Sequence, residues 1–204
     1  MTVEDKEWQK VIDLYAEAKS CFILYEETGD HKTNIQVLNE YRSALDHVMQ
    51  IIVLKLEGGS ARTDIKNRFE PLLEHLQRAL CDLLDTISIN YRNMIIDELA
   101  PYSPDTITVA IPKYYSEHRP FIEEISERII GYRSGKNESI PMENLREYTN
   151  DVSELKGIYK QILLSKPGLI EVDRSDKKKK RRTLFITCLG WVIGIISILI
   201  AVFK

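Results

Sequence analysis

The sequence predicts an all-α protein: a cytoplasmic bundle of about five helices, followed by a single C-terminal transmembrane helix. Apolar residues recur every three or four positions over most of residues 3–164, which is the spacing of amphipathic helices. Residues 183–203 contain no ionisable side chain except one cysteine thiol. With only 9 Gly, only 7 Pro and 44% hydrophobic residues, the composition excludes collagen-like, linker-dominated and disordered chains.

Three helices are expected in the first half of the chain. The first runs from Val3 to about Thr28, where Gly29-Asp30 ends it, and the second from about Thr33 to Glu57, before Gly58-Gly59. The third starts near Ser60 or at Pro71 and continues to about Leu99. The apolar stripe that we expect to turn the second helix toward the core consists of Ile35, Leu38, Leu45, Met49, Ile52 and Leu56.

The pattern breaks over residues 100–120. Thr106 to Ile111 has the composition of a strand but no obvious partner strand, so this region is interpreted as an extended connection. A fourth helix is expected from about Pro120 to Tyr132, and a fifth from about Met142 to Leu164.

Charge divides the chain into three parts. Residues 177–204 hold 7 of the 28 basic residues and none of the 31 acidic ones, which leaves residues 1–176 with a net charge of −10. We therefore expect a cytoplasmic helical domain over residues 1–168, a linker and basic collar over 169–182, and a membrane span over 183–203. The collar is the uninterrupted basic run Lys177, Lys178, Lys179, Lys180, Arg181 and Arg182.

The final segment has the length of a membrane span. As a helix, its 21 residues rise about 31 Å, close to the thickness of a bilayer core. The positive-inside rule then predicts a single-pass protein of the inner or plasma membrane, with its N-terminal domain in the cytoplasm. The collar and Trp191 would contact a bilayer with anionic headgroups. Gly190, Gly194 and Ser197 form a small-residue face through which spans could self-associate into a homo-oligomer.

The rest of the chain shows few chemical motifs. Cys21, Cys81 and Cys188 are scattered, which fits free thiols in a reducing compartment rather than a disulfide framework. The four histidines are dispersed, and no phosphate-binding loop or metal-ligand spacing occurs, so neither a metal nor a cofactor is expected.

One pair of residues in the second expected helix has catalytic character. Arg42 is followed five residues later by His47, and this spacing in an all-α domain resembles the Arg-x4-6-His motif of the HEPN superfamily. The resemblance implies a metal-independent ribonuclease in which His47 exchanges protons and Arg42 holds the scissile phosphate. On a straight helix, however, the two side chains point about 140° apart. The alternative is that Arg42 forms an ion pair and His47 is an ordinary surface or interface residue.

Three functions follow, in order of preference. HEPN-like domains fused to a span resemble accessory effectors of prokaryotic antiphage and CRISPR systems, which implies a tail-anchored effector that oligomerises or senses a defence partner and depolarises the membrane. The second is a non-enzymatic membrane anchor or adaptor for a cytoplasmic partner. The third is a membrane-tethered HEPN-type ribonuclease, although a body of net charge −10 disfavours RNA. Enzymatic activity is thus left open, with the balance against it.

Overall fold

The computed structural model describes residues 2–29, 34–57, 62–134 and 142–202; within these ranges it gives no side-chain detail for residues 62–64, 133, 134, 142, 195 and 197–202. The predicted all-α class is confirmed, since every regular element in these ranges is helical. The helices are α1 Val3–Thr28, α2 Ile35–Leu56, α3 Arg62–Leu99, α4 Pro104–Ala110, the π-helix η1 Tyr114–His118, α5 Arg119–Ser134 and α6 Met142–Val202.

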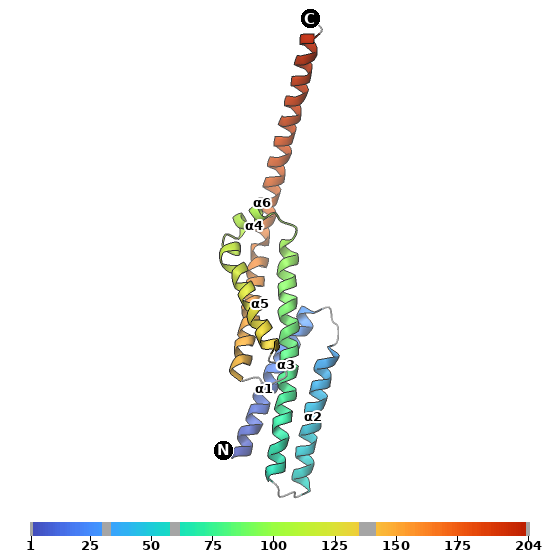
Figure 1. The fold of residues 1–204 in the computed structure, drawn as a ribbon, viewed down its shortest axis with the longest axis vertical. Coiled ribbons are helices and arrows are strands. Elements are labelled where there is room, and N and C mark those ends of the chain that lie inside the picture. Colours follow the sequence, from blue (N-terminus) through green and yellow to red (C-terminus); the bar gives the residue numbers. More distant parts are fainter. Residues whose placement is uncertain (1, 30–33, 58–61, 135–141, 203–204) are drawn as a thin grey trace. The chain divides into compact units, whose positions relative to one another are not determined.

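The chain divides into two compact units. The first comprises residues 1–95 and 121–159, and the second comprises residues 96–120 and 160–204. In the first unit, α1, α2 and α3 lie alongside one another (Figure 1), with residues of α5 and the first part of α6 completing the core. Leu14, Leu80, Leu84, Ile125 and Leu155 are each at most 1% exposed.

Local capping explains where the first two helices begin. The side chain of Thr2 accepts a hydrogen bond from the backbone N–H of Asp5, and the Asp5 carboxylate accepts one from the N–H of Thr2. This reciprocal pair satisfies donors that the first turn of a helix leaves free. At α2, the Asn34 side chain accepts from the N–H of Val37. These polar residues mark the helix starts independently of tertiary packing.

The core-facing stripe predicted for α2 is wrong. Val37, Ala44 and Ile51 are the buried residues of this helix, whereas Leu38, Leu45, Met49, Ile52 and Leu56, with Ile35, are exposed. Two apolar rows run along α2, and the row containing the small residue Ala44 faces the neighbouring helices. The apolar stripes of α3 and α6 face the core, through residues that include Leu76, Leu83, Tyr148 and Val152.

The region expected to be extended is helical. Ser103 caps α4 by accepting a hydrogen bond from the N–H of Thr106, and Pro104 occupies the first turn. A capping serine followed by proline is a strong helix start, and it outweighs the strand propensity of the β-branched residues that follow. In the second unit, Thr106, Ile107 and Ile111 become buried as a result.

Helix α6 continues without a break from Met142 to Val202, through the segment 169–182 that was expected to be a linker. Pro167 lies within it and is exposed. A proline leaves the carbonyl four residues earlier without its helical donor, but water can bind that carbonyl at an exposed position. The division into domains itself stays a prediction.

The predicted transmembrane span is also wrong. Among the residues that the structure describes, no helix has the length and apolar character needed to cross a membrane.

Candidate functional site

The two predicted catalytic residues lie on different faces of α2. Arg42 is exposed and lies on the apolar stripe between Leu38 and Leu45, whereas His47 is half-buried and its ring stacks on that of His75 in α3. The two ring centroids are 5.4 Å apart. One copy of the chain therefore does not bring the Arg42 guanidinium and the His47 imidazole to a common point.

The structure instead assembles a different cluster of polar residues between α2 and α3. Glu40 Oε2 lies 2.7 Å from His75 Nδ1 and accepts a hydrogen bond from Arg78 Nε at 3.1 Å. Arg78 Nη2 lies 2.8 Å from the same His75 nitrogen. The Nδ1 atom of His75 cannot form both contacts as hydrogen bonds at once. When it carries a proton, it donates to Glu40; when it does not, it accepts from Arg78.

The electrostatics of the cluster favour an ionised Glu40 and a neutral His47. Burial raises the pKa of Glu40, but the hydrogen bonds from His75 and Arg78 outweigh it and hold the pKa below its usual value. Burial lowers the pKa of His47, and the nearby His75 and Arg68 lower it further. The Nδ1 atom of His47 is buried and has no hydrogen-bond partner among the described residues.

This arrangement is suited to joining two helices rather than to catalysis. Glu40, the common acceptor, is already engaged by His75 and Arg78, and Arg78 also lies 3.6 Å from Glu74. A general base needs reach to a substrate proton, yet the free atom in the cluster, Nδ1 of His47, is buried. In the described part of the chain, no group of three or more His, Cys, Asp or Glu side chains is placed to hold a metal ion.

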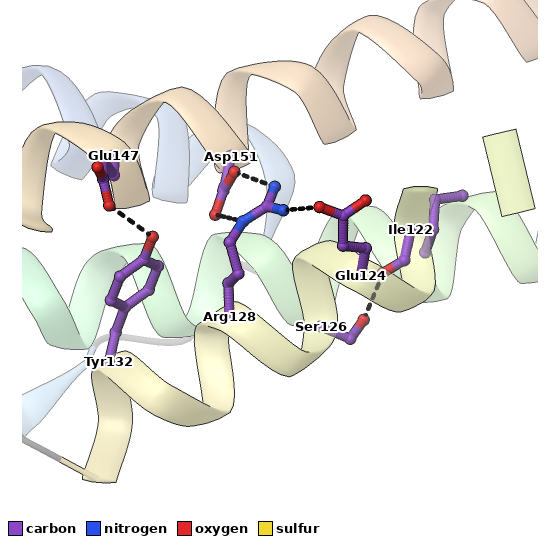
Figure 2. A network of polar contacts seen from close by, with 7 residues as sticks. All are labelled: Ile122, Glu124, Ser126, Arg128, Tyr132, Glu147 and Asp151. Atoms are coloured by element: carbon purple, nitrogen blue, oxygen red, sulfur yellow. Dashed lines mark hydrogen bonds and ion pairs between the residues drawn. The ribbon is translucent and has the colours of Figure 1, made fainter. Parts of the chain in front are cut away.

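A second polar network joins α5 to α6, and Figure 2 shows its geometry. Arg128 donates from Nε to Asp151 Oδ2 at 3.0 Å and from Nη2 to Oδ1 at 2.7 Å. It also donates to Glu124, one turn earlier on α5. Asp151 and Glu124 thereby raise the pKa of Arg128, so the guanidinium stays charged at all ordinary pH values.

An open pocket of about 340 Å³ lies between α1 and α3. Its polar lining includes the carboxylates of Glu7, Glu70 and Glu74, beside Phe69 and Leu73. Glu7 pairs with Lys10 at 2.9 Å, and Glu74 approaches Arg78. The described lining holds neither a histidine nor a cysteine, so nothing in it indicates a nucleophile.

The basic collar lies on α6, within the segment that was expected to be a linker, and all six side chains of residues 177–182 are exposed. Lys177 pairs with Asp173 at 2.7 Å, and Lys179 lies 4.0 Å from Asp176. Among the described residues, the other four collar side chains form no ion pair. Six consecutive helical residues point in all directions around the helix axis, so the collar forms a ring rather than one charged face.

The remaining predicted residues lie further along the same helix. Trp191 is 72% exposed, and a Cβ added at Gly190 or Gly194 would meet no atom within 4 Å. The side chain of Ser197 lies outside the described residues. Packing through Gly190 and Gly194 stays a prediction.

Sequence reasoning missed Glu40, His75 and Arg78. Glu40 lies seven residues before His47 on α2, and Arg78 follows His75 by three on α3, so each pair shares a helix face. That spacing is visible in the sequence. The pairing of these two faces depends on how α2 packs against α3, and no sequence pattern gives it.

Comparisons with known proteins found no relatives. No family model matches the sequence, and neither the curated proteins nor the solved structures contain a significant match. The resemblance to the HEPN superfamily is therefore not supported.

Proposed function

We propose that this chain is a non-enzymatic adaptor that docks on anionic lipid headgroups through residues 177–182 and holds its helical body at that surface. The observation that carries this proposal is the basic collar: six consecutive basic residues, all exposed on one continuous helix. Arg42 and His47 lie on different faces of α2, which weighs against a ribonuclease that uses these two residues together. A role in antiviral defence stays a prediction.

The electrostatic attraction is confined to the collar. Each basic residue near an anionic membrane surface contributes about 1 kcal/mol, and the effect fades within a Debye length. Asp173 and Asp176 offset part of the charge of Lys177 and Lys179, so Lys178, Lys180, Arg181 and Arg182 carry most of the attraction. Residues 1–176, with a net charge of −10, are repelled by the same surface.

Exposed apolar side chains follow the collar directly. Leu184 and Phe185 are each 69% exposed, and Trp191 is 72% exposed. Apolar contact at the boundary between headgroups and acyl chains adds to electrostatic binding, and tryptophan favours that boundary. The proposal therefore combines a charge contact with an interfacial apolar contact on adjacent turns of α6.

Flotation of the full chain with lipid vesicles tests this proposal. Vesicles of phosphatidylcholine with about one third phosphatidylglycerol should carry the protein, and pure phosphatidylcholine vesicles should carry much less. Changing Lys178, Lys180, Arg181 and Arg182 to Gln should lower the apparent affinity for anionic vesicles at least about 100-fold, since about 4 kcal/mol is removed. Raising the salt concentration should weaken binding of the unmodified chain.

A matched control removes the same number of charges elsewhere. Lys6, Lys19, Lys156 and Lys160 are exposed and lie outside the collar. Changing these four to Gln should leave vesicle binding unaltered. Equal binding to neutral and anionic vesicles, or equal losses in the two variants, would overturn the proposal.

A further inference from the structure

Helix α2 carries an exposed apolar stripe, which consists of Ile35, Leu38, Leu45, Met49, Ile52 and Leu56. These six side chains are between 39% and 81% exposed. Together with Arg42 they follow alternating steps of three and four residues along the whole helix. Such a repeat is the seam that one helix presents to another in a coiled coil.

The chain does not use this stripe for its own core. The opposite side of α2 is buried through Val37, Ala44 and Ile51. On one flank, α1 lies close by, because the rings of Tyr15 and Tyr41 are 6.4 Å apart. On the other flank, Glu40 and His47 face α3. Among the described residues, the stripe and the adjacent polar residues Asn39, Asp46 and Gln50 belong to the part of α2 that is left exposed.

We propose that the α2 stripe is the interface through which two copies of this chain associate, with the two α2 helices packed antiparallel. This inference concerns a different surface from the collar and does not rest on lipid docking. A second copy suits the stripe because it satisfies both the apolar repeat and the charge within it.

Charge decides both the occupant and the direction. Arg42 is the one charged residue in the repeat, and it forms no ion pair among the described residues; Asp46 lies one turn further along the same exposed side. A parallel pair would place Arg42 against Arg42 of the second copy, where like charges repel. An antiparallel pair with Arg42 opposite Leu45 of the second copy places Asp46 of that copy within one residue.

The antiparallel register also aligns the apolar residues. Leu38 then faces Met49 of the second copy, and Ile35 faces its Ile52, with each contact repeated by the two-fold symmetry. Six half-exposed side chains from each copy would bury on the order of 1,000 Å² in total, the lower end of the range for specific interfaces. Tyr15 on α1, which is 49% exposed and whose ring lies 6.4 Å from that of Tyr41, adds apolar surface on the α1 side of the stripe.

The first test measures the mass of the full chain by sedimentation equilibrium, in a mild detergent and at several protein concentrations. We expect twice the mass of one chain at micromolar concentration. Leu45→Asp, which enters the interface twice, should weaken association at least about 100-fold. Leu164→Asp is the matched control, because Leu164 is an exposed leucine on another helix, 73% against 58% for Leu45. This control should leave the mass of the dimer unchanged.

The second test checks the antiparallel register. Arg42→Asp should weaken association about tenfold or more, because it places two carboxylates near each other in each half of the interface. Asp46→Arg should do the same with two cations. The double variant that exchanges the two charges should recover most of the affinity, since each new pair is again of opposite sign.

The outcomes separate the alternatives. A full chain that remains a monomer at 100 µM would overturn the proposal, as would a Leu45→Asp variant that associates like the unmodified chain. The latter result is what association through the apolar residues of α6 would produce. Failure of the charge exchange to restore affinity would overturn the antiparallel arrangement.

Discussion

The pair formed by Arg128 and Asp151 offers a quantitative test of what holds α5 to α6. Two charge-assisted hydrogen bonds join the guanidinium to the carboxylate, at 3.0 and 2.7 Å. The Asp151 side chain is only 10% exposed, whereas that of Arg128 is 34% exposed. We consider the change Asp151→Asn, which keeps the size of the side chain but removes its charge and one acceptor.

The expected cost lies between two limits. Breaking a fully buried ion pair costs about 3–5 kcal/mol, and an exposed pair contributes at most about 1 kcal/mol. Arg128 is partly solvated and keeps its contact with Glu124, so solvent and Glu124 compensate part of the loss. We therefore expect Asp151→Asn to lower the free energy of unfolding by about 2 kcal/mol. For a chain of this size, the corresponding fall in melting temperature is about 4–8 °C.

Urea unfolding of the full chain, followed by circular dichroism at neutral pH, measures this loss. Glu124→Gln is the control: its carboxylate contacts the same guanidinium but is 63% exposed, so the expected loss is below about 0.5 kcal/mol. The reasoning would be refuted if Asp151→Asn left the urea midpoint unchanged, or if Glu124→Gln lowered the free energy of unfolding more than Asp151→Asn. Either result would mean that the buried contact of Arg128 with Asp151 is not the more stabilising of the two.

Three further changes concern buried groups. Tyr148→Phe removes the hydroxyl that donates to the Asp85 carboxylate and should cost about 1.5–3 kcal/mol in urea unfolding; an unchanged midpoint would contradict this. Tyr41→Phe should instead stabilise the fold by about 1 kcal/mol, since the Tyr41 hydroxyl is buried without a partner in the described residues. The same change should remove a phenol that titrates near pH 12, because burial raises the pKa of Tyr41 to about 12. For His47, burial holds the folded-state pKa below the ordinary 6.5, so the unfolded chain binds the proton more readily and stability should fall as pH drops from 6.5 through the folded value. His47→Gln should flatten that pH dependence in unfolding experiments, and an equally steep profile would argue against His47 as its source.

Periodicity was sufficient to predict the helical class and most helix ends, because each of these depends on local sequence. α1 ends at Thr28 as expected, and α3 ends at Leu99. Where a helix has one apolar row, such as the part of α3 around Leu76, Leu80 and Leu83, that row is the buried face. For such a helix, the hydrophobic effect has only one way to bury the apolar side chains.

Helix α2 shows where this reasoning fails. Its sequence contains a row of large apolar residues and a second row of Val37, Ala44 and Ile51, and periodicity favours the larger. The structure buries the second row. One further constraint is that Glu40, on the α3 side of the helix, pairs with His75 and Arg78, which fixes the rotation of α2. A tertiary contact therefore selected the face, and the polar cluster was hidden from sequence analysis for the same reason.

The collar was found from sequence alone because a run of basic residues can be recognised without knowing its tertiary contacts. The exposure of the α2 stripe, in contrast, became visible only in the fold.

Taken together, our two proposals have a joint consequence. Because Lys177 and Lys179 are partly offset by aspartates, one collar contributes between about 4 and 6 kcal/mol, which corresponds to a dissociation constant between about 1 mM and tens of micromolar. A dimer carries two collars, and binding of the second becomes intramolecular at an effective concentration near millimolar, which strengthens binding by up to about two orders of magnitude. Disrupting the stripe with Leu45→Asp should therefore weaken vesicle binding while every collar residue stays in place.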